Sequence, residues 1–212
     1  MFRRLVLGIG SLLWLTGCVS YGVYSGPQTV EPGVTEVGVG TMLARSSEWG
    51  PEDPVVALAE TALLLRHGVA PNFDLGARLW FFPVTFFVEE DPAIGLYADA
   101  RYRFIDDRWM LTGSAGVSAF SAGGMISVGA YPTILFGTER VYAGLRGILL
   151  RVITDGGHSD PDDPQLSDWA IGVVSGASFG DRWVVRPELN LYLRDVFSTV
   201  LLTPGVSLHR RF

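Results

Sequence analysis

The chain of 212 residues contains one cysteine, Cys18, and no lysine at all. A single cysteine excludes an intrachain disulfide and a cysteine-rich metal site. Charged residues make up 18% of the chain, less than the about 25% that is usual in soluble domains. The net charge of −6 excludes the basic surface that nucleic-acid binding requires, so we expect no nucleic-acid partner. Helical periodicity is also missing, because even the best candidate, residues 54–68, lies between strand-like neighbours.

The first 17 residues have the three parts of a secretory signal peptide. Arg3 and Arg4 give a positive start, an apolar run extends from Leu5 to Leu15, and small residues come before Cys18. The apolar run is shorter than the about 20 residues that a membrane-spanning helix needs. We therefore expect residues 1–17 to be removed, which leaves a net charge of −8.

Residues 15–18, "LTGC", resemble the bacterial lipobox. The resemblance implies that Cys18 becomes the first residue and carries acyl groups such as palmitate. The next residue is Val19 rather than Asp, which in the lipoprotein family implies export to the outer membrane. The alternative is an ordinary secretory signal that happens to end near a cysteine. Residues 18–32 have no clean period and contain Gly and Pro, so they are predicted to form a lipidated tether.

From residue 33 to the end, the apolar residues recur with period two. The runs are about a dozen residues long, which is near the about 9–11 residues of a transmembrane strand and well above the about 5–6 of an average soluble strand. Ten such runs can be recognised: residues 33–45, 55–66, 73–84, 93–104, 109–120, 125–136, 141–152, 168–179, 183–194 and 198–212.

The connections between these runs alternate between two kinds. One kind is short, such as "IDDR" at 105–108 and "GTER" at 137–140, and the other includes longer acidic pieces such as residues 153–167. Bacterial outer-membrane barrels have short periplasmic turns, longer outer loops and an even number of strands. Closure into a barrel also removes the exposed edges of a ten-stranded sheet. The pattern predicts an all-β fold, a closed antiparallel up-and-down transmembrane β-barrel with both ends of the barrel domain in the periplasm.

The two faces of each run support a barrel with apolar residues facing lipid and polar residues facing the lumen. In residues 73–81, Leu75 and Leu79 alternate with Asp74 and Arg78. Aromatic residues gather near both ends of the runs, as expected for interface girdles; the predicted girdles are Phe73, Phe104, Trp109, Phe179, Trp183 and Phe212 at the short-turn end, and Phe81, Phe82, Phe86, Phe87, Phe120 and Trp169 at the long-loop end. Pro132, Pro187 and Pro204 fall inside runs, so we expect β-bulges there.

The chain ends in Phe212, with Leu208 and Val206 at alternate positions before it. This ending resembles the C-terminal signal of small bacterial outer-membrane β-barrel proteins, although Arg210 departs from its apolar alternation. The resemblance covers residues 33–212 as a pattern and implies the barrel-assembly machinery as a partner that reads Val206, Leu208 and Phe212.

Charged residues fall at the middle of the inward faces, where charges must be paired because burial of each costs several kcal/mol. One interpretation is a salt-bridge network that fills the lumen, and the other is a narrow pore lined by arginine. A ten-stranded barrel lies between packed eight-stranded barrels and open porins. The candidate lumen residues are Glu60, Arg78, Asp99, Arg101, Arg146 and Glu188.

An enzyme is the less favoured alternative. The best candidate site is the loop with Asp155, His158, Ser159 and Asp160, but triads are built from separate segments and no family motif is visible. His67 and His209 are expected to face water. The acidic loops are predicted to be a solvated rim rather than a metal site, and we expect no cofactor.

The sequence thus predicts a signal peptide (1–17), a lipidated tether (18–32) and a barrel (33–212). The expected location is the bacterial outer membrane, with the lipid-anchored N-terminus on the periplasmic side. The expected role is structural, or the binding of an envelope protein. The expected partners also include the lipids of the outer membrane. A narrow pore for small solutes is the main functional alternative. A soluble β-rich lipoprotein is the alternative fold, and it requires the outward Leu and Val residues to pack in a core.

Overall fold

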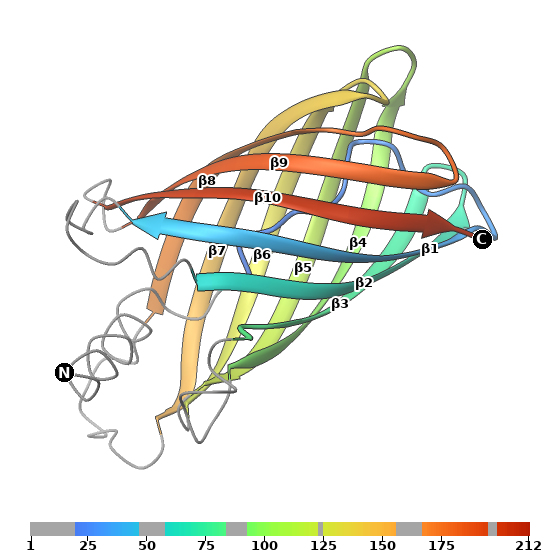
Figure 1. Ribbon diagram of the computed structural model, residues 1–212. Coiled ribbons are helices and arrows are strands. Elements are labelled where there is room, and N and C mark those ends of the chain that lie inside the picture. The colour runs from blue at the N-terminus through green and yellow to red at the C-terminus, as the bar shows by residue number, and fades with distance from the viewer. Residues whose placement is uncertain (1–19, 47–57, 84–92, 123–124, 156–166, 195–198) are drawn as a thin grey trace.

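The computed structural model describes residues 20–46, 58–83, 93–122, 125–155, 167–194 and 199–212. These residues form a closed barrel in which each strand pairs antiparallel with the next and β1 pairs with β10 (Figure 1). The strands are β1 (Thr35–Ser46), β2 (Leu58–Ala70), β3 (Phe73–Phe81), β4 (Ile94–Asp106), β5 (Met110–Ala122), β6 (Met125–Gly137), β7 (Val141–Asp155), β8 (Ser167–Ala177), β9 (Trp183–Arg194) and β10 (Thr199–Arg211). The predicted ten-stranded up-and-down barrel is confirmed.

The barrel has two distinct ends, which we name by their connections. The turn end carries the β2–β3, β4–β5, β6–β7 and β8–β9 connections, the start of β1 and the C-terminus. The loop end carries the other connections, including residues 47–57 and 156–166. Among the described residues, no helix is long and apolar enough to cross a membrane.

The period of two in the sequence becomes an alternation of exposure along each strand. In β9, Val185 and Leu189 are exposed, whereas Arg186, Glu188 and Asn190 are buried in the lumen. Successive side chains of a strand point to opposite faces, and closure turns those faces into an outside and an inside.

The outside of the barrel carries a belt of exposed aliphatic side chains. Leu96 is 64% exposed, Val117 63% and Leu145 56%. Exposing apolar surface to water costs roughly 25 cal/mol per Å². The soluble alternative required these side chains to pack in a core, and the structure does not pack them there.

Aromatic side chains form an exposed girdle at the turn end, as predicted. It includes Phe104, Trp109 and Phe212, which are 64%, 51% and 64% exposed. The prediction was wrong for Phe82 and Phe120, which are buried. Both rings pack inside the barrel against Trp80, with centroids 5.7 and 5.6 Å away. Phe86 and Phe87 lie outside the described residues.

The predicted bulges at the three prolines are not found. The β9–β10 register passes through Pro187 and Pro204 without a shift, and the β5–β6 register does the same at Pro132. Each proline instead interrupts the pairing on one side only, since it lacks one N–H donor. In β1–β10, for example, the pairing skips from Met42↔Gly205 to Arg45↔Leu202 at constant register.

The segment before β1 lies inside the barrel. Residues 20–30 are almost all buried, and Figure 1 shows this part of the chain as a blue tube running within the strands. The sequence suggested a tether beside the barrel for residues 18–32, and the structure corrects this for residues 20–30. Inward-facing glycine makes the room: a Cβ at Gly40 would lie 2.7 Å from the ring of Tyr24. We call residues 20–34 the lumen segment.

Candidate functional site: the filled lumen

The lumen segment is held by charged side chains of the barrel wall, beginning with Glu60 and Arg78. The carboxylate of Glu60 accepts hydrogen bonds from Ser20 Oγ at 2.9 Å and from the Tyr21 amide at 3.2 Å. Arg78 Nη1 donates to Ser20 Oγ at 2.6 Å and to the Gly22 carbonyl oxygen at 2.5 Å. Arg78 and Glu60 are also 4.0 Å apart, at the limit of an ion pair. Each of these two charges is therefore satisfied mainly through the segment.

Arg146 and Glu188 depend still more on the segment for their hydrogen-bond partners. Arg146 is 1% exposed and donates to the carbonyl oxygens of Gly22 at 2.5 Å and Ser20 at 3.3 Å. Its guanidinium also lies 4.9 Å from the Tyr131 ring centroid. Glu188 accepts from the Val23 amide at 3.1 Å and from a tyrosine hydroxyl of the wall. Within the described part of the chain, neither residue has an ion-pair partner.

A second charged cluster lies nearer the turn end, around the fully buried Asp74. Its carboxylate pairs with Arg66 at 2.5 Å and Arg101 at 2.6 Å, and Arg66 also pairs with Asp99 at 2.7 Å. The same carboxylate accepts the amide of Val30 at 2.8 Å. This cluster is a true ion-pair network, and it too includes the segment.

Arg101 and Thr112 hold the segment's backbone at this level. Arg101 donates to the carbonyl oxygens of Gly26 at 2.8 Å and Gln28 at 3.1 Å. The hydroxyl of Thr112 donates to the Pro27 carbonyl oxygen. The wall therefore contacts consecutive backbone groups rather than distinctive side chains.

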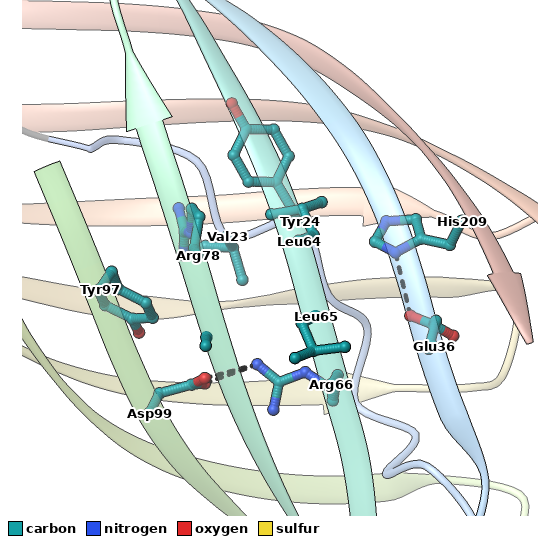
Figure 2. A pocket seen from close by; sticks show the side chains of 11 residues that line it. Val23, Tyr24, Glu36, Leu64, Leu65, Arg66, Arg78, Tyr97, Asp99 and His209 are labelled. Carbon is teal, nitrogen blue, oxygen red and sulfur yellow. Dashed lines mark hydrogen bonds and ion pairs between the residues drawn. The ribbon is translucent and has the colours of Figure 1, made fainter. Parts of the chain in front are cut away.

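A third cluster surrounds Glu36 in β1. Its carboxylate pairs with Arg186 at 2.6 Å, Arg211 at 3.0 Å and His209 at 3.1 Å. Figure 2 shows the contact between Glu36 and His209, and the Arg66–Asp99 pair beside it. His209 was expected to face water, and this was wrong. It is 3% exposed because its parity in β10 points it into the lumen.

The other ring nitrogen of His209, Nε2, lies 2.8 Å from Ser207 Oγ. A serine, a histidine and a carboxylate in line are the elements of a hydrolytic triad. Here, however, the carboxylate of Glu36 is already shared with two arginines, and Ser207 is 1% exposed. The arrangement therefore serves as part of the lumen packing, without access for a substrate.

The pocket in Figure 2 lies between these clusters and the segment. Its volume is about 20 Å³, enough for about one water molecule. Tyr24 and Val23 of the segment line it together with Arg66, Asp99 and His209. The pocket has no room for a solute larger than water.

The structure points all six predicted lumen residues into the barrel. It does not join them in one network: Asp99 and Arg101 belong to the turn-end cluster, while Arg146 and Glu188 contact the segment. The prediction omitted Arg66, Asp74, Glu36 and Arg186, although their inward parity is visible in the sequence. The decisive partner, the lumen segment, has no periodic signal that could have placed it inside.

The remaining predicted residues lie elsewhere. Val206, Leu208 and Phe212 point outward and are 43%, 41% and 64% exposed. Cys18 and the loop residues His158, Ser159 and Asp160 lie outside the described residues, and the side chain of Asp155 is not described. In the described ranges, no group of three or more His, Cys, Asp or Glu side chains is arranged to hold a metal ion.

No family model and no curated protein matches this sequence. Solved structures match by fold. An outer membrane channel from Pseudomonas putida F1 is 12% identical, with 92% of this chain and 100% of that chain covered and a TM-score of 0.50. The attachment invasion locus protein Ail of Yersinia pestis is 14% identical over 85% and 99% of the two chains, with a TM-score of 0.35. The KdgM porin is 10% identical over 81% and 98%, with a TM-score of 0.39. The closed antiparallel barrel and the match to the Pseudomonas putida channel show that the chain has the fold of outer-membrane β-barrel proteins.

Proposed function

We propose that this chain is an outer-membrane β-barrel lipoprotein whose own N-terminal segment closes its lumen, with a structural or partner-binding role. One observation carries the proposal: the mid-lumen charges Glu60, Arg78, Arg146 and Glu188 take groups of residues 20–23 as hydrogen-bond partners. Buried charges left without partners are costly, so removing the segment would destabilise the wall. The segment is therefore part of the folded barrel.

The outer surface supports the membrane location. Exposed aliphatic residues such as Leu96 and Val117 form the lipid-facing belt, and the aromatic girdle marks the turn-end interface. Acylation of Cys18 is part of the proposal and rests on "LTGC". Val206, Leu208 and Phe212 are exposed on the outward face, where the barrel-assembly machinery would read them during insertion.

Planar-bilayer conductance tests the closed lumen. We expect the mature chain, residues 18–212, to be silent. Arg146→Ala removes two hydrogen bonds to the segment and should cause leak currents. Steady conductance of the wild-type barrel would overturn the closed-lumen role.

A narrow pore for small solutes remains the second candidate, with the lumen segment as its gate. It is favoured by the glycines of the inner wall: a Cβ at Gly40 would lie 2.7 Å from the Tyr24 ring. If the segment left the lumen, the space beside Gly40 that the Tyr24 ring now occupies would become open, because glycine has no side chain to fill it. The pore hypothesis predicts brief openings of the wild-type barrel, which Arg146→Ala would lengthen. The scaffold hypothesis predicts no wild-type openings.

A further inference from the structure

The lumen segment has a direction, and this direction decides where the mature N-terminus emerges. Near the turn end, Val30 bonds to Asp74, the second residue of β3, and Pro27 bonds to Thr112, the third residue of β5. The Gly33 amide bonds to the Gly68 carbonyl oxygen at the same end. Going back along the chain from residue 34 to residue 20 therefore leads from the turn end into the lumen.

Ser20 and Tyr21 lie in the loop-end half. Ser20 bonds to Glu60, the third residue of β2, which begins at the loop end. The Tyr192 hydroxyl donates to the Tyr21 carbonyl oxygen at 2.7 Å, and Tyr192 is two residues from the loop-end terminus of β9. The segment thus crosses most of the barrel's length.

The chain before Ser20 cannot turn back through the lumen. Residues 20–30 are needed to cover the distance in one direction, while two residues reach at most about 7 Å. The Tyr192 ring of the wall packs against Tyr21, with the ring centroids 5.2 Å apart, and occupies the space on that side of the segment. The described chain therefore enters the lumen from the loop end, at Ser20.

We infer that the barrel threads its own N-terminus outward, so that the acyl chains on Cys18 enter the outer leaflet beside the long loops. Longer loops lie on the outside of outer-membrane barrels. This inference rests on the proposed function, since it needs both the membrane barrel and the acylated cysteine. It places the anchor on the side opposite to the periplasmic one expected from the sequence.

The arginines of the inner wall are suited to bind an extended chain, because they donate hydrogen bonds to backbone carbonyl oxygens. Arg78 and Arg146 bind the Gly22 carbonyl oxygen, and Arg101 binds those of Gly26 and Gln28. Most of these bonds recognise backbone and tolerate any side chain that fits. At the loop end, the acyl chains of Cys18 would insert into the outer leaflet of the membrane, where burial of their CH₂ groups anchors the chain.

The test is thiol labelling of cells that express the full chain with Val19→Cys, using a membrane-impermeant maleimide. Acylation occupies the thiol of Cys18, so Cys18 should not react and the new cysteine reports the position next to the anchor. Asp107→Cys, in the exposed β4–β5 turn, is the periplasmic control. Ser159→Cys, in the β7–β8 connection, is the outer control.

We expect Val19→Cys to react on intact cells, as Ser159→Cys does, while Asp107→Cys reacts only after permeabilisation. Reaction of Val19→Cys only after permeabilisation would overturn the threading and leave the proposed membrane barrel in place. Absence of reaction under both conditions would also overturn it, because the residue would then be enclosed. If the two controls fail to differ, or if the wild-type chain itself reacts, the fault lies in the proposed function.

Discussion

Arg146 in β7 donates a 2.5 Å hydrogen bond from Nη1 to the carbonyl oxygen of Gly22, which lies 124 residues earlier in the chain. The contact joins the middle of the barrel wall to a segment that precedes the first strand. Hydrogen bonds to charged groups contribute about 1.5–3 kcal/mol each, more than neutral ones. Contacts of this kind hold the lumen segment against the wall.

Arg146→Met should lower the free energy of unfolding by about 2 kcal/mol or more. Methionine fills part of the volume but leaves the buried carbonyl oxygen of Ser20 without a donor, at about 1–3 kcal/mol. The Gly22 carbonyl oxygen loses one of its two donors and keeps Arg78. Urea unfolding in lipid vesicles measures the change. The matched control is Arg108→Met in an exposed turn, which should stay within about 0.5 kcal/mol of wild type. Equal effects of the two variants would show that the Arg146 contacts contribute nothing.

Asp74→Asn should lower the free energy of unfolding much more than Asp107→Asn does. The substitution leaves Arg66 and Arg101 buried with one carboxylate fewer, and breaking a buried ion pair costs about 3–5 kcal/mol. Asp107→Asn removes a carboxylate of the same kind from an exposed turn and serves as the control. Urea unfolding of both variants in vesicles checks the difference. If Asp74→Asn lowers the free energy of unfolding by less than about 1 kcal/mol, Asp74 is not the centre of a stabilising ion-pair network.

Two valines of the outer face test the lipid-facing belt. Val117, near the middle of β5, is 63% exposed, and Val141, at the turn-end start of β7, is 55% exposed. Arginine on the lipid face costs about 2–4 kcal/mol at the midplane and about 0–1 kcal/mol near the interfaces. Val117→Arg should therefore destabilise the vesicle-inserted barrel much more than Val141→Arg. Equal small losses would mean that the outward residues face water.

Phe212→Ala should slow assembly while leaving the finished barrel almost as stable. The backbone of Phe212 exchanges hydrogen bonds with Thr35, which the variant keeps. Phe104→Ala is the matched control, because that ring is at the same end and is also 64% exposed. The measurement is the fraction of heat-modifiable, folded barrel in outer membranes over time. If both variants assemble equally fast, Phe212 is not part of an assembly signal.

The strands could be predicted from the sequence because inward and outward residues alternate so regularly. The same parity placed Arg146 and Glu188 in the lumen, and it also puts His209 there, because Val206 and Leu208 of the same strand face outward. The position of the lumen segment was not predicted for a physical reason: most of its hydrogen bonds are made by backbone groups, such as the carbonyl oxygen of Gly22, which leave no trace in the sequence. The prediction of bulges at the prolines was wrong because a closed barrel can also accommodate a proline by skipping two residue pairs at constant register, as at Pro204 and Pro132.

Whether residues 20–30 fill the lumen can be measured by amide hydrogen exchange at Val23 and Val30 in the micelle-bound barrel. Their amides donate to the buried carboxylates of Glu188 and Asp74. We expect both amides to exchange as slowly as strand amides, and Glu188→Leu should speed exchange at Val23 more than at Val30. Exchange of both amides at the rate of an unstructured chain would contradict a filled lumen.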